Sequence, residues 1–210
     1  MSRPHADGPE SLSSIPKIKV RIESLSDLVF GLALSFGSLI LIGSQPKNGL
    51  DLLVNIFIFG FSFMIVVMTW IGYTRTITVL PAEASYALVL NLGLLFCVAL
   101  EPYLFYLLIT TQLVGVAEPA SIAYAVDAGL MFLFLAGLAR LVVMSQQKIR
   151  DSQLHPLVLK RFNRLMKIQA IIGGIYVISA LPIFWINTPF GYLRFYLWFS
   201  PFLIVPAYRR

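Results

Sequence analysis

The chain has 210 residues, of which 58% are hydrophobic and 12% are charged, and its formal net charge is +6. Soluble domains carry about 25% charged residues, and a globule of this size could not hide so much apolar surface from water. The composition therefore excludes an ordinary soluble protein and predicts an all-helical integral membrane protein. The basic residues are dispersed between apolar runs, which argues against a nucleic-acid partner.

Six apolar runs follow a polar N-terminal segment. Residues 1–20 predict a disordered cytoplasmic tail, residues 21–206 a six-helix transmembrane channel domain, and residues 207–210 a second short tail. Each run has about the 20 residues that a helix needs to cross the hydrocarbon core. The expected spans are residues 25–43, 50–73, 86–111, 121–144, 165–186 and 189–206.

Lys and Arg predict which side of the membrane each connection faces. They gather in the N-terminal flank, in the second and fourth connections and at the C-terminus, so both termini are expected in the cytoplasm. The fourth connection, residues 145–164, is long and basic. It predicts an interfacial helix against anionic lipid headgroups, which makes membrane lipids an expected partner.

Asp27 lies just inside the first predicted span, where a carboxylate is costly unless it meets partners or water. We expect a hydrogen-bonded cluster around it, with Arg21 or Arg75 as countercharge. The alternative is that Asp27 only caps the N-terminus of the helix. The other expected members of the cluster, at the same depth in the first three spans, are Ser26, Trp70, Tyr73 and Asn91.

The residues after Asp27 carry a stripe at helical spacing. Such a stripe is typical of helix packing, and periodicity alone does not separate a packed face from the lining of a pore. The residues that share this face are Leu28, Leu32, Ser35, Phe36 and Leu39.

The start of the first span resembles a known signature. Residues 21–27, Arg-Ile-Glu-Ser-Leu-Ser-Asp, resemble the Arg-x-x-x-Phe-Ser-Asp motif that opens the first helix of the transmembrane protein 175 family of potassium channels. Trp70 near the end of span two is similar to that family, as is a third span with Asn91 early and Pro102 late. Six spans would correspond to one repeat, as in prokaryotic homologues, which implies a location in the plasma membrane.

Three positions depart from the family pattern. Leu25 stands where phenylalanine is usual, Leu28 where a small residue is usual, and Tyr73-Thr74 where many members carry histidines. These departures bear on the detail of the polar cluster more than on the fold.

The resemblance implies a homotetramer with four copies of the first helix around a potassium-conducting pore that has no carbonyl filter. Leu32 would form the narrowest hydrophobic ring, Phe36 and Leu39 further rings, and Ser35 a polar ring. Potassium would be preferred over sodium because it sheds water at lower cost. Apolar rings can also gate by dewetting. No cofactor is implied beyond the permeating ion.

Other functions remain possible from the residues alone. Asp27, Glu101 and Asp127 lie in or near spans and would serve a proton conductor or proton-coupled transporter, although a structural role is favoured for each. A non-conducting scaffold would show the same apolar stripe.

No residues suggest a catalytic centre. His5 and His155 are far apart without metal-ligand spacing, and Cys97 has no activating base nearby in sequence, so no enzyme is expected. The run at residues 188–192, Thr-Pro-Phe-Gly-Tyr, is similar to a potassium-channel filter. It contains a proline and lacks a second glycine and a preceding pore helix, and is therefore rejected.

Overall fold

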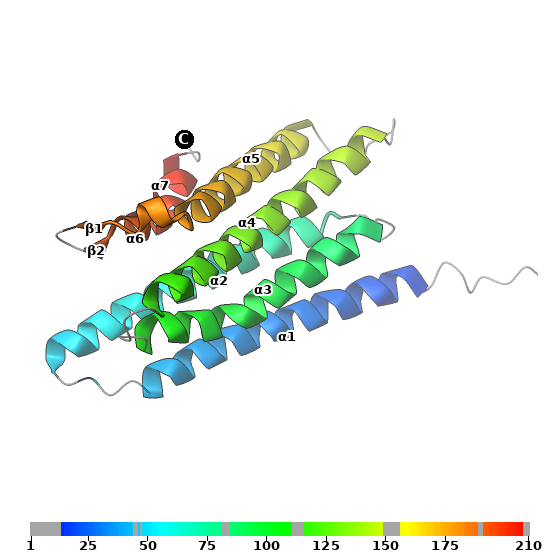
Figure 1. The fold of residues 1–210 in the computed structure, drawn as a ribbon. Coiled ribbons are helices and arrows are strands. Elements are labelled where there is room, and N and C mark those ends of the chain that lie inside the picture. The colour runs from blue at the N-terminus through cyan, green and yellow to red at the C-terminus, as the bar shows by residue number, and fades with distance from the viewer. Residues whose placement is uncertain are drawn as a thin grey trace, which may run out of the picture.

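The computed structural model describes residues 14–43, 46, 48–80, 85–110, 116–148, 156–188 and 191–207. Five long helices dominate this part of the chain and lie alongside one another (Figure 1). They are α1 (Ser14–Gly43), α2 (Gly49–Ile77), α3 (Ser85–Thr110), α4 (Ala117–Lys148) and α5 (Pro156–Ser179).

Four helices of the described residues are long and apolar enough to cross a membrane, and they contain four of the predicted spans. Their candidate spans are Val20–Gly43, Gly49–Ile77, Tyr86–Leu108 and Ala117–Ser145. The start of α2 is fixed by a polar side chain, because Asn48 accepts a hydrogen bond from the backbone N–H of Asp51 at 2.8 Å. This contact satisfies one of the free N–H groups at the end of the helix.

The helices begin earlier than the predicted boundaries at the N-terminal tail and at the fourth connection. α1 begins at Ser14, so residues 14–20, which we assigned to a disordered tail, are helical; residues 1–13 lie outside the described residues. α5 begins at Pro156 and therefore contains the second half of the predicted fourth connection. Proline suits this position because the first turn of a helix has no use for its missing N–H group.

The C-terminal part differs most from the prediction. α5 ends at Ser179, and a short 3-10 helix, Pro182–Phe184, replaces the last turns of the predicted fifth span. Strands β1 (Asn187–Thr188) and β2 (Gly191–Tyr192) then pair as an antiparallel hairpin.

Two short helices end the described chain. They are α6 (Leu193–Trp198) and α7 (Ser200–Ala207), and they form a shorter apolar segment, Leu193–Pro206. The sixth predicted span, residues 189–206, is therefore not one continuous helix. Pro201 contributes to the break at Phe199, since it lacks the N–H that would donate to the carbonyl oxygen of Leu197 in a continuous helix.

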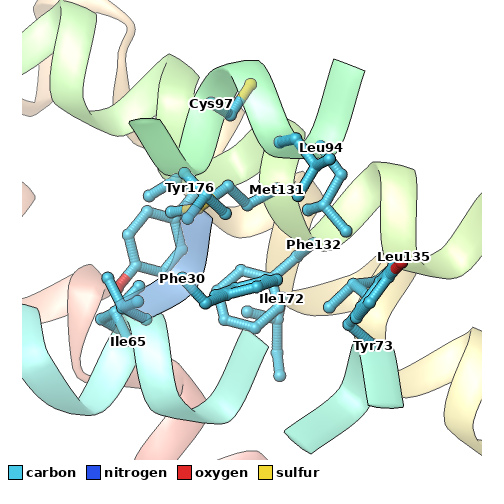
Figure 2. Close-up of a cluster of buried hydrophobic side chains, with 14 of the residues drawn as sticks. Phe30, Ile65, Tyr73, Leu94, Cys97, Met131, Phe132, Leu135, Ile172 and Tyr176 are labelled. Atoms are coloured by element: carbon cyan, nitrogen blue, oxygen red, sulfur yellow. The ribbon is translucent and has the colours of Figure 1, made fainter. Parts of the chain in front are cut away.

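The core lies around α4, which packs against α2, α3 and α5, while α1 packs against α2 and α3. Figure 2 shows how side chains of these helices meet, among them Phe30 of α1, Ile65 of α2, Met131 of α4 and Tyr176 of α5. All four are at most 2% exposed. With Leu94 of α3, which is fully buried, all five long helices contribute to the interior of the bundle.

α4 and α5 approach closely through two glycines. A Cβ atom on Gly173 would lie 2.8 Å from the carbonyl oxygen of Gly129, closer than real side chains come. Small residues of this kind let the backbones of membrane helices pack closely.

Arg194 of α6 is fully buried and ties the C-terminal part to the bundle. Its Nε donates to the carbonyl oxygen of Ser179 at 2.7 Å, and its Nη2 lies 3.2 Å from the carbonyl oxygens of Ala180 and Leu181. Its Nη1 donates to the hydroxyl of Ser121 on α4. The side chain thus satisfies backbone carbonyls at the end of α5.

Candidate functional site

α1 presents two opposite faces in the bundle. Ser26, Phe30 and Ala33 are at most 4% exposed, and Gly37 is buried with them. These residues recur at helical spacing, so one face of α1 is packed against α2 and α3.

The predicted stripe lies on the other face. Its four large apolar side chains are between 46% and 58% exposed, and Ser35 is exposed as well. The described residues of this chain therefore do not provide the packing that periodicity alone would suggest for this face. The four side chains are Leu28, Leu32, Phe36 and Leu39.

The hydroxyl of Ser35 is oriented by its own helix. Ser35 Oγ donates to the carbonyl oxygen of Gly31 at 2.8 Å. Its single proton is thereby used, and its lone pairs remain available to a group outside the helix.

Asp27 and Ser26 contact two residues one turn apart on α2. Trp70 Nε1 donates to Asp27 Oδ1 at 3.0 Å, and the hydroxyls of Ser26 and Tyr73 are 2.7 Å apart. Ser26 Oγ also lies 2.8 Å from the carbonyl oxygen of Ile22, which can only accept, so Tyr73 serves as the donor to Ser26. Asp27 lies in the interior of α1, which begins at Ser14, and therefore does not cap the helix.

Asn91 and Arg21 occupy different surroundings. Asn91 of α3 is 2% exposed and lies beside the Tyr73 side chain. Its Oδ1 has no hydrogen-bond partner among the described residues. Arg21 is exposed. In the part of the chain that the structure describes, Asp27 is partnered by the indole of Trp70 and not by an arginine.

A second polar group lies in the core between α2, α3 and α4. Glu101 is 2% exposed, accepts a hydrogen bond from Ser62 at 2.5 Å and lies 3.5 Å from the Tyr124 hydroxyl. Sequence reasoning identified the acid but missed both partners. In the sequence, the two partners, Ser62 and Tyr124, are distinguished only by carrying a hydroxyl within an apolar run.

Asp127 of α4 is 4% exposed and lies beside Cys97. Its Oδ2 has no hydrogen-bond partner within the described part of the chain. Glu101 is on α3 and Asp127 is on α4, so neither acid belongs to the exposed stripe of α1. In the same described residues, no group of three His, Cys, Asp or Glu side chains is arranged to hold a metal ion.

Residues 21–102 match a family model described as "Endosomal/lysosomal potassium channel TMEM175". No curated protein and no solved structure matches the chain. The matched segment runs from Arg21 in α1, through α2, to Pro102 in α3, and it contains the stripe and every member of the polar cluster. The resemblance noted in the sequence is confirmed over these residues, and the four long apolar helices fit a multi-pass membrane protein. Over residues 21–102, less than half of its length, the chain is thus similar to the TMEM175 family of potassium channels.

Proposed function

We propose that the chain is the subunit of a homotetrameric, potassium-permeable channel in which four copies of α1 surround the pore. The observation that supports this most directly is the exposed stripe on α1, whose opposite face is packed against the chain's own helices. A membrane helix packed on one side only must meet lipid or another subunit on the other. A homotetramer with the stripes at its axis would use this free face.

The constriction in this proposal is a ring of Leu32 side chains. Leu32 is 46% exposed and lies near the middle of the stripe, with Phe36 and Leu39 one and two turns further along. An apolar ring offers no groups to replace the hydration shell of an ion. An ion that sheds its waters more easily therefore passes the ring at lower cost. Potassium holds its waters less tightly than sodium and would be preferred.

Ser35 would provide the polar ring next to this constriction. Because its proton is donated to the carbonyl oxygen of Gly31, the oxygen would face the axis with its lone pairs. A cation would then meet acceptors and no competing donor. Four such oxygens could partly replace the waters lost at Leu32.

The position of α1 in this pore would be held by the contacts of Asp27 and Ser26 with α2. Both residues lie before the stripe, and both contact α2 side chains at hydrogen-bonding distance. The cytoplasmic position of both termini and of these contacts follows from the Lys and Arg distribution and belongs to the proposal. So does a location in the cell's inner (plasma) membrane, whereas the description of the matched family refers to endosomes and lysosomes.

The proposal is tested by substituting Leu32 in protein reconstituted in liposomes. Leu32→Ala should widen the constriction and Leu32→Asn should wet it. Both should raise conductance and shift the bi-ionic reversal potential towards equal potassium and sodium permeability. Leu203→Ala is a matched control, since Leu203 is also an exposed leucine, 71% exposed, but lies on α7. Unchanged conductance and reversal potential in both Leu32 variants would exclude this residue from the constriction.

The alternative of a proton conductor makes a different prediction. It would require Asp27, Glu101 or Asp127 to exchange protons along a path. Glu101→Gln keeps an oxygen that can accept from Ser62 but cannot release a proton near neutral pH. Potassium current that survives separate neutralisation of the three acids would argue against a relay, whereas proton flux abolished by one of them would support it.

A further inference from the structure

An apolar pocket of about 390 Å³ lies between α2, α3, α4 and α6. Its floor is buried, because Phe105, Tyr124 and Trp198 are at most 5% exposed. Its rim is open, because Phe57 is 64% exposed and Phe199 is 38% exposed. The pocket therefore reaches from the surface of the bundle to its core, and its volume is typical of small-molecule sites.

Aromatic rings bridge α2 to the C-terminal helices beside this pocket. The rings of Phe61 and Phe199 are 5.2 Å apart between centroids, and those of Phe57 and Phe199 are 6.3 Å apart. Figure 1 shows α6 and α7 with α5, across the bundle from α1. The pocket is thus separate from the stripe of the proposed pore.

The chemistry of the walls restricts what can occupy the pocket. Among the described residues that line it, only two side chains have polar atoms, and both atoms already have partners within the chain. The Tyr124 hydroxyl lies 3.5 Å from Glu101, and Trp198 Nε1 donates to Ser179 Oγ at 3.1 Å. Water needs two to four polar partners to be held in such a site, so the walls favour hydrocarbon over water.

The pocket lies in the membrane-spanning part of the chain, where lipid hydrocarbon is available to fill it. Phe57, Phe105 and Tyr124 all lie within candidate membrane spans, so the rim opens where the surrounding solvent is lipid acyl chain. We propose that the pocket binds one acyl chain of a bilayer phospholipid, whose headgroup stays outside. The acyl chain makes the van der Waals contacts that the side chains of the walls would lack around an empty space.

Fluorescence quenching by brominated lipid tests this proposal, because Trp198 forms part of the floor and is 5% exposed. The emission of Trp198 is obtained as the difference between the unmodified protein and Trp198→Phe. It is measured in phosphatidylcholine vesicles with and without bromine in the middle of one acyl chain. We expect bromine to remove most of the Trp198 emission, since the brominated acyl chain would contact the indole ring.

Pocket-filling variants separate entry of the chain from quenching by the surrounding bilayer. Leu108→Phe and Ile58→Phe each add a ring to the lining, keep all three tryptophans and should restore Trp198 emission in brominated vesicles. Ile56→Phe makes the same kind of change at an exposed α2 residue outside the lining and should restore nothing. If one of the two pocket-filling variants misfolds, the other still tests the proposal.

Three results would overturn the proposal. Equal quenching in the unmodified protein and both filling variants would place the quenching lipid outside the pocket. No quenching at all would indicate that a second copy of the chain covers the pocket or that it closes. Quenching by a brominated free fatty acid, but not by the phospholipid, would make a single-chain lipid the occupant.

Discussion

The indole of Trp70 donates a hydrogen bond to the carboxylate of Asp27, with 3.0 Å between Nε1 and Oδ1. The contact joins the middle of α1 to the second half of α2, at the level where Ser26 meets Tyr73. It gives a carboxylate within a candidate span one of the partners that such a group requires.

Removing the Asp27–Trp70 contact should loosen α1. Interhelical hydrogen bonds in membrane proteins contribute about 0.6–1.7 kcal/mol, so Trp70→Phe and Asp27→Leu should each lower Tm by about 2–6 °C. Asp27→Asn should lose less, because its Oδ1 can still accept from the indole. Thermal unfolding of the purified protein in detergent measures these changes.

The control for this pair is Thr74→Ala, since Thr74 Oγ1 donates only to the carbonyl oxygen of Trp70 in its own helix among the contacts described. The double variant of Asp27 and Trp70 should be about as stable as the less stable single variant. Fully additive losses would show that the two side chains do not interact.

Ser35→Ala should reduce conductance by roughly two- to tenfold, because the loss of one polar contact costs about 0.5–1.5 kcal/mol. Ser35→Thr keeps the hydroxyl and should conduct nearly normally. Single-channel recordings compare these variants with Ser38→Ala, which removes a hydroxyl from the flank of α1 outside the stripe. A conductance that falls equally in Ser35→Ala and Ser38→Ala would contradict a specific role of Ser35.

Two adjacent glycines of α5 should respond in opposite ways to alanine. At Gly173 the new Cβ would meet the Gly129 carbonyl oxygen at 2.8 Å, whereas at Gly174 it would meet nothing within 4 Å. Gly173→Ala should therefore lower Tm by forcing α4 and α5 apart. Gly174→Ala should leave Tm unchanged or raise it, because alanine stabilises a helix by up to about 1 kcal/mol relative to glycine. The same thermal assay decides, and a stable Gly173→Ala protein would contradict the close approach.

Arg194→Lys should be strongly destabilising although it keeps the charge. An ammonium cannot reach the carbonyl oxygens of Ser179, Ala180 and Leu181 together with the Ser121 hydroxyl. Several buried acceptors would lose their donor, at a cost of roughly 3 kcal/mol or more. Arg161→Lys, at an exposed position of α5, is the control and should be neutral. Equal yield and Tm of the two variants would show that the buried contacts do not stabilise the fold.

The apolar runs of the sequence were sufficient to place α2, α3 and α4. Residues 86–111 were predicted as a span and α3 is Ser85–Thr110, because the length of an apolar run is set by the thickness of the bilayer. The partners of Asp27 could be proposed in the same way, since depth along each helix follows from the rise per residue. Trp70 was among them.

The C-terminal part could not be predicted in this way. The pairing of Asn187 with Tyr192 and the break at Phe199 depend on contacts between short segments, which leave little trace in hydropathy. The contacts of Arg194 could not be predicted either, because its acceptors come from α4 and the end of α5 and meet only when these helices are assembled.

The buried guanidinium also constrains how the chain is made. Arg194 follows Ser179 by 15 residues, so the ribosome adds it after the end of α5 has been synthesised. Until Arg194 has folded back against α5, the last carbonyl groups of α5 must find water or lipid headgroups, since hydrocarbon offers them no donor. Folding of this region is therefore completed only after both segments have been made.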